Sequence, residues 1–272
     1  MIRWSRVLCV LTKDWREFSR SGWLVGTALA LTVYFGVVLP AIIVFGARIS
    51  GGAVVPISIP VRLGDLPLPA APEGLDEVAR SVYAAFSLIV PPLFLVIPLA
   101  VSTVMAADSF AGERERGTIE VLLAAPLTER ELFLAKALAS LAPGVAASWG
   151  AFALMALATN LMSADMFGGW WFPSGPEWYV VVALVSPLYA FLAISLIVLA
   201  SSRARSAREA QQASAILVAP ILAAVFGQVL GGFAIGLEHL LISAAALAGL
   251  DAGLVALAPG RFFSGVRYMR VD

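Results

Sequence analysis

Residues 21–47 read SGWLVGTALALTVYFGVVLPAIIVFGA, and no charged side chain lies between Arg20 and Arg48. An α-helix needs about 20 apolar residues to cross the roughly 30 Å hydrocarbon core of a bilayer, so this run is long enough to span a membrane. Five more runs of this kind follow along the chain, at 81–107, 137–164, 178–202, 210–237 and 240–260. Only the last contains a charge, Asp251. The pattern predicts six transmembrane helices.

These runs predict an all-α integral membrane protein, with a single transmembrane domain over residues 1–272. The transmembrane helices are expected at 22–46, 82–107, 129–161, 176–201, 210–236 and 240–259. Outside the membrane we expect an interfacial amphipathic helix at 2–20, an outer loop at 47–80, a cytoplasmic segment at 109–125 and a cytoplasmic tail at 260–272.

The composition excludes several classes of protein. Hydrophobic residues make up 60% of the chain and charged residues 13%, about half the usual share, which is too few to cover a soluble globule. The net charge of zero gives no reason to expect a nucleic-acid partner. A single cysteine, Cys9, excludes an intramolecular disulfide, and a single histidine, His239, argues against a zinc site. We therefore expect no metal. No cleavable signal peptide is evident, so the first span should be retained.

The basic residues predict the orientation. Of the 18 lysines and arginines, all except Arg48, Arg62 and Arg80 lie in segments on the same side of the predicted spans as the N-terminus. By the positive-inside rule that side is the cytoplasm. We expect a multi-pass protein of the cell membrane (inner or plasma) with both termini in the cytoplasm.

The N-terminal segment has the pattern of an amphipathic helix. Trp4, Leu8, Leu11, Trp15 and Phe18 are spaced as one helical stripe, and the basic residues lie mostly off that stripe. Such a helix lies flat on a membrane surface. A helix that binds a soluble partner is the alternative.

Local signals predict where the helices begin. Thr128 and Glu131 form the pattern of a capping box at the start of the third span, and Ser174 and Glu177 repeat it before the fourth. Residues 76–80 are expected to begin the second span early. Prolines exclude a long helix through the first part of the 47–80 loop, which is either part of an external gate or a passive connector.

The segment at 108–127 reads DSFAGERERGTIEVLLAAPL. After its alternating charges, Gly117 allows the helix to break or turn. Thr118 can then cap a second short helix, with Glu120 well placed near its N-terminus. Ile119, Leu122 and Leu123 give this helix an apolar side that must rest on something. A solvated charged loop is the alternative.

This segment closely resembles the signature of type-2 ABC exporter permeases, the ABC-2 superfamily. That signature has the form Gly-Glu-Arg/Lys-Glu-Arg-Gly-Thr-Leu/Ile-Glu-x-Leu-Leu-x-x-Pro, and residues 112–126 follow it throughout. Residues 131–136 resemble the Glu-Leu-x-x-Gly-Lys that follows in the family, with Ala135 in place of the glycine. Residues 206–212 are similar to the sodium-efflux-type branch.

The resemblance implies a homo- or heterodimeric permease, embedded in the lipid bilayer, whose coupling helix docks into a separate ATPase subunit. On the present chain the coupling region covers about 109–125. The residues matched to it are Glu113, Arg114, Glu115, Arg116, Gly117, Thr118, Glu120, Leu122 and Leu123. ATP and Mg²⁺ would be bound by the partner ATPase, so the permease itself would have no catalytic residues and no cofactor.

The residues themselves support a separate ATPase. A phosphate-binding P-loop needs Gly-x-x-x-x-Gly-Lys-Ser/Thr. The two lysines, Lys13 and Lys136, follow threonine and alanine, so neither fits. We expect ATP to be hydrolysed by another polypeptide.

A few polar and small residues inside the spans are candidates for special roles. Asp251 is either a group that binds substrate or protons, or a packed structural acid. Gln228 is a second possible intramembrane polar site. Close helix packing, a dimer interface or a re-entrant turn is suggested by the glycines Gly22, Gly26, Gly227, Gly231, Gly232 and Gly236.

Two other functions stay open. A membrane scaffold or channel subunit would have no need of the coupling region. An intramembrane enzyme would need a motif such as His-Glu-x-x-His or Gly-x-Ser-x-Gly, and the chain contains neither. The apolar spans suit a lipid-like or amphipathic cargo, but sodium, haem, drugs, peptides and glycolipids remain alternatives.

Overall fold

The computed structural model describes residues 3–52, 71–115, 128–201, 206–231 and 235–268. Every regular element in these ranges is helical. In chain order the helices are α1 (Trp4–Arg20), α2 (Gly22–Val33), α3 (Leu39–Ser50), α4 (Glu77–Ala84), α5 (Val90–Phe94), α6 (Val96–Ala107), α7 (Glu113–Glu115), α9 (Glu129–Phe167), α10 (Glu177–Val180), α11 (Ser186–Ser201), α12 (Ala207–Gln212), α13 (Val218–Gly231) and α14 (Leu237–Tyr268).

Wider helical turns join these pieces into long helices. They cover Tyr34–Val38, Ala85–Ile89, Asp108–Gly112 and Val181–Val185, and each has the i→i+5 bonding of a π-helix. A tighter turn at Ala213–Leu217 joins α12 to α13. The interruptions therefore bend or widen the spans without ending them.

Six helical stretches are long and apolar enough to cross a membrane. They are Gly22–Ser50, Glu77–Gly112, Glu131–Phe167, Glu177–Ser201, Ala207–Leu230 and Leu237–Val255. The prediction of an all-α membrane protein with six spans is confirmed. The early start of the second span is confirmed as well, because α4 begins at Glu77 and the Asp76 carboxylate accepts a hydrogen bond from the Ala79 N–H at 2.7 Å.

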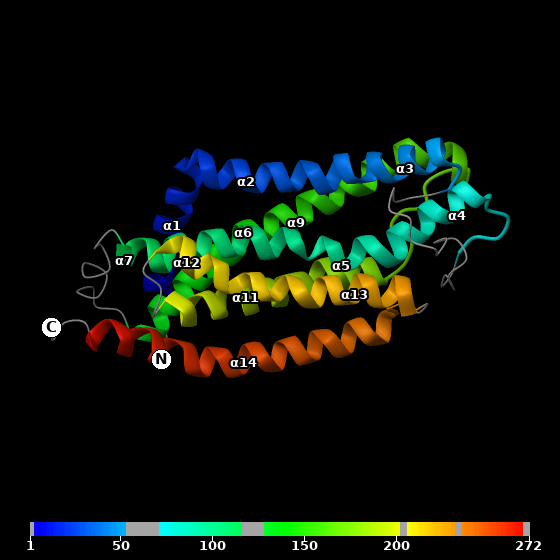
Figure 1. Ribbon diagram of the computed structural model, residues 1–272. Coiled ribbons are helices and arrows are strands. Elements are labelled where there is room, and N and C mark those ends of the chain that lie inside the picture. The colour runs from blue at the N-terminus through cyan, green and yellow to red at the C-terminus, as the bar shows by residue number, and fades with distance from the viewer. Residues whose placement is uncertain (1–2, 53–70, 116–127, 202–205, 232–234, 269–272) are drawn as a thin grey trace.

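The spans run roughly along one axis and form an elongated bundle (Figure 1). α1, α7, α12 and the last turns of α14 gather at one end, which we call the α1 end, and α4 lies at the opposite or far end (Figure 1). The long helix α9 packs against α1, α2, α6 and α11. α13 packs against α5, whereas α14 packs against α11.

One of the two predicted capping boxes is present. The Thr128 hydroxyl accepts from the Glu131 N–H at 3.2 Å, and the Glu131 carboxylate accepts from the Thr128 N–H at 2.9 Å. The second prediction was wrong. α10 follows Pro176 with no side-chain cap. The Ser174 hydroxyl lies instead 3.5 Å from that of Ser87 on the neighbouring span.

Two glycines that the sequence did not suggest lie in close contact with a neighbouring helix. A Cβ added at Gly144 would lie 2.1 Å from the Ser102 hydroxyl oxygen, and one added at Gly36 would lie 2.7 Å from the Leu154 Cβ. At Gly22, Gly26 and Gly236 a Cβ would meet no atom of the described residues within 4 Å.

These last three glycines therefore make no tight contact with the part of the chain that the structure describes. Gly227 is partly exposed, the surroundings of Gly231 are not described, and Gly232 lies outside the described residues. A role for any of these glycines at a dimer interface stays a prediction.

Candidate coupling site

A buried lysine at the α1 end binds the beginning of the predicted coupling region. Lys136, in the second turn of α9, is 3% exposed, and Glu113, at the start of α7, is 4% exposed. The Lys136 Nζ lies 2.5 Å from the Glu113 Oε2 and also donates to the Ser109 carbonyl oxygen at 2.7 Å and to the Ser109 hydroxyl at 3.2 Å. This contact joins the ends of the second and third spans.

Helix α1 adds a second lysine to the same carboxylate. The Lys13 Nζ lies 2.9 Å from the Glu113 Oε1 and 3.2 Å from the Glu17 Oε1. The Asp14 Oδ2 accepts from the Ser109 hydroxyl at 3.1 Å. We call Lys13, Asp14, Glu17, Glu113 and Lys136 the ion cluster. It connects α1, the end of the second span and the start of α9.

The way α1 presents two different faces explains the cluster. Val7, Val10, Asp14 and Phe18 are spaced three or four residues apart and are all buried, so they form the inner face. Trp4, Leu8 and Trp15 of the predicted stripe are exposed. The periodicity predicted the helix, but Phe18 belongs to the inner face. The burial of Asp14 could have been found only from its register with Val7 and Val10.

Burial and charge act in opposite directions on the two ionisable groups of α1. Burial raises the pKa of the Asp14 carboxyl above its usual value, although Lys136 and Lys13 oppose the shift. For Lys13, burial lowers the pKa, but the hydrogen bond and charge of Glu113 outweigh it and leave the pKa raised. Lys13 therefore stays charged, and Asp14 is the group of α1 whose ionisation costs free energy.

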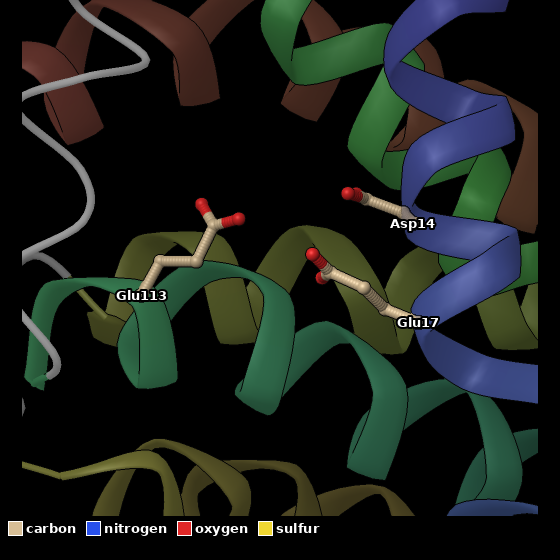
Figure 2. Close-up of side chains that lie close together, drawn as sticks. All are labelled: Asp14, Glu17 and Glu113. Carbon is tan, nitrogen blue, oxygen red and sulfur yellow. The ribbon is translucent and has the colours of Figure 1, made fainter. Parts of the chain in front are cut away.

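Three carboxylates of the cluster converge as metal ligands would. Oxygens of Asp14, Glu17 and Glu113 lie within 4.8 Å of one another, and Figure 2 shows the three side chains approaching from α1 and α7. The Lys13 Nζ, however, lies within 3.5 Å of an oxygen of each. The ammonium group of Lys13 therefore supplies the cation that these oxygens surround.

The structure places only the start of the predicted coupling region. Glu113 is turned into the protein, whereas Glu115 is exposed and its carboxylate accepts from the Ala207 N–H at 3.2 Å, which ties α7 to α12. Arg114 is described by its backbone alone. Outside the described residues lie Arg116, Gly117, Thr118, Glu120, Leu122 and Leu123. The sequence did not predict that Lys13 and Lys136 would join this site.

The two intramembrane polar candidates differ in their bonding. Gln228 is 1% exposed, donates to the Leu88 carbonyl at 2.7 Å and accepts from the Ile235 N–H at 2.9 Å, so it links the second and fifth spans to the turn before α14. Asp251 is 6% exposed, and neither carboxylate oxygen has a hydrogen-bond partner among the described residues. A role for either group in transport stays a prediction.

Comparison with known families adds one match. The model of the ABC-2 family transporter protein matches residues 8–243, from the second turn of α1 into α14, and so includes the whole ion cluster. A comparison with curated proteins gave no match.

Proposed function

Because the chain belongs to the ABC-2 family of transporter proteins, and is thus the permease component of an ABC transporter, we propose that it couples substrate export to ATP hydrolysis on a separate subunit. The partner is an ATPase subunit that binds ATP and Mg²⁺. Two permease protomers, identical or paralogous, would form the translocation path. The α1 end of the bundle is the cytoplasmic end in this proposal, as the basic residues predict.

The ion cluster is the observation that supports coupling. Glu113 stands just before the segment 116–125, and its carboxylate is bonded to Lys13 and Lys136 at once. A displacement of that segment would therefore pull on α1 and on α9 together. Since α9 is a single helix that continues across the membrane, the displacement would reach the far end of the bundle.

The burial of Glu113 divides the predicted coupling residues into two groups. The buried Glu113 is bonded to Lys13 and Lys136 inside the protein, and Glu115 is bonded to the first residue of α12. Direct contact with the ATPase is assigned to Arg116, Gly117, Thr118, Glu120, Leu122 and Leu123. ATP binding would close two ATPase subunits, and the permease protomers would then rock between inward-open and outward-open states.

Co-purification tests this proposal. The protein, extracted from its native membrane, should bring down a nucleotide-binding subunit that mass spectrometry identifies. Arg116→Glu should weaken that association, whereas Arg16→Glu, on the exposed side of α1, should leave it intact. If the ATPase binds both variants equally and its hydrolysis rate in proteoliposomes is unchanged, the segment is not the coupling element. If no nucleotide-binding subunit is recovered, the proposal of a separate ATPase fails.

A further inference from the structure

An apolar cavity of about 540 Å³ lies between the second, fourth, fifth and sixth spans. Its walls include Pro91 of α5, Val185 before α11, Ile221 of α13 and Leu247 of α14. The volume falls within the range of about 300–1,000 Å³ that is usual for small-molecule sites. It exists because α13 packs on the second span while α14 packs on the fourth, so these consecutive helices diverge.

The polar groups of the cavity are concentrated near one end. Glu177 begins α10, His239 is in the first turn of α14, and both line the cavity at the far end of the bundle. The hydroxyls of Tyr189 and Ser243, which also line the cavity, donate to the Leu217 and Leu240 carbonyls within the protein. The Gln228 amide, also in the wall, is engaged by Leu88 and Ile235.

This distribution favours hydrocarbon over water as the occupant. A buried water needs two to four polar partners, and the side chains of Tyr189, Gln228 and Ser243 in the wall already bond to the protein backbone. An empty space would deprive the lining side chains of dispersion contacts. A flexible hydrocarbon chain that enters from the adjoining leaflet needs no polar partner there and gives the lining side chains their dispersion contacts. Its polar end would lie at the rim.

The rim also selects the charge of the occupant. Among the described residues that line the cavity, Glu177 is the one acid, and neither lysine nor arginine is present. An anionic head group would be repelled by this carboxylate, and no lysine or arginine of the described lining would offset the repulsion, whereas a cationic head group would form an ion pair with Glu177.

We infer that the cavity binds one hydrocarbon chain of an amphiphile with a positively charged head group, with the chain between α13 and α14 and the head beside Glu177. This inference concerns binding alone and does not depend on ATP coupling, so either can fail without the other.

Photo-crosslinking of the full chain in phosphatidylcholine nanodiscs tests the inference. The probes are hexadecylamine and hexadecyl sulfate, each with a diazirine near the end of its chain. The amine should label peptides of α13 and α14 saturably, and should do so about threefold more strongly than the sulfate, the factor expected for one partly exposed ion pair.

Matched alanines separate the cavity from the lipid-facing surface. Ala224 lines the cavity, whereas Ala223, its neighbour on α13, is exposed and does not. Ala224→Trp should abolish the saturable labelling, and Ala223→Trp should leave it unchanged. If Ala224→Trp fails to fold, Ala246→Trp fills the cavity from α14, with Ala245→Trp as its control. Glu177→Gln should remove the preference for the amine but keep the labelling.

Three results would overturn the inference. The first is labelling that does not saturate and spreads evenly over the lipid-facing surface. The second is an equal loss of labelling in Ala224→Trp and Ala223→Trp. The third is equal labelling by hexadecylamine and hexadecyl sulfate, which would show that the rim does not select a cationic head group.

Discussion

Replacement of Glu113 by glutamine should destabilise the α1 end of the bundle, because it leaves the buried Lys136 without its principal counter-charge. Lys136 would retain Ser109, but its nearest carboxylate oxygen would be that of Asp14 at 3.9 Å. Removal of one partner from a buried ion pair costs about 3–5 kcal/mol. Lys13 adds little to that cost, because its side chain is 45% exposed and can turn to water.

The reciprocal change, Lys136→Met, should lower the free energy of unfolding by less than Glu113→Gln does. Lys136→Met leaves the Glu113 carboxylate with the Lys13 Nζ at 2.9 Å, so the loss should be about 1–3 kcal/mol. The double variant buries neither charge unpaired. It should recover roughly 2 kcal/mol relative to the sum of the single changes. Glu17→Gln is the control, because that side chain is 57% exposed, and it should cost less than about 1 kcal/mol.

Two measurements check these values. Denaturation in mixed micelles with increasing dodecyl sulfate gives the free energy of unfolding of each variant. A spin label on Cys9, the single cysteine and exposed on α1, reports whether α1 is released before the spans unfold. Equal costs for Glu113→Gln and Lys136→Met, with an additive double variant, would refute the idea of a buried and mutually dependent pair.

Four further changes have defined outcomes in the same denaturation assay. Since the pKa of Asp14 is raised in the folded state, its ionised form costs stability above that pKa, and the cost disappears below about pH 4. Asp14→Asn should therefore be neutral or stabilising at pH 7. A gain in stability that does not shrink on acidification would contradict the raised pKa. Asn160→Ala should cost about 2–4 kcal/mol, because the Asn160 amide accepts from the Trp171 and Phe172 N–H groups and donates to the Phe172 carbonyl in the loop after α9. A cost below about 1 kcal/mol would exclude that anchoring role. Gly144→Ala should cost about 1–3 kcal/mol through overpacking while Gly26→Ala costs little, and equal effects would refute the contact. Asp251→Asn should be neutral or stabilising, and a clear loss of stability would show that the carboxylate has a partner outside the described residues.

Local signals predicted what depends on local chemistry. The Thr128 capping box formed because the hydroxyl, the carboxylate and the two N–H groups all lie within one helical turn. The same spacing at Ser174 failed, because Pro176 stands at the helix start and Ser174 faces Ser87 of another span. A cap thus follows from sequence only when the surrounding chain leaves the side chain free for it.

Spacing alone could not identify the packing surfaces of the helices. Gly22 and Gly26 are four residues apart, yet they face open space as far as the described residues go. Gly36 and Gly144 belong to no repeated pattern, yet they meet the neighbouring helix closely. A glycine spacing shows that a helix permits close approach, but the relative rotation of two helices decides whether it occurs.

The sequence by itself determined the number of spans, because the length of a charge-free run compared with the thickness of the hydrocarbon is a property of one segment at a time. Only the tertiary structure decided what the charges at the α1 end do. Lys13, Glu113 and Lys136 lie far apart in the chain, and each looks like an ordinary charge in a polar segment. They meet because α1 crosses the end of the second span beside α9. Burial there turns surface charges into a site in which each ion depends on its neighbours.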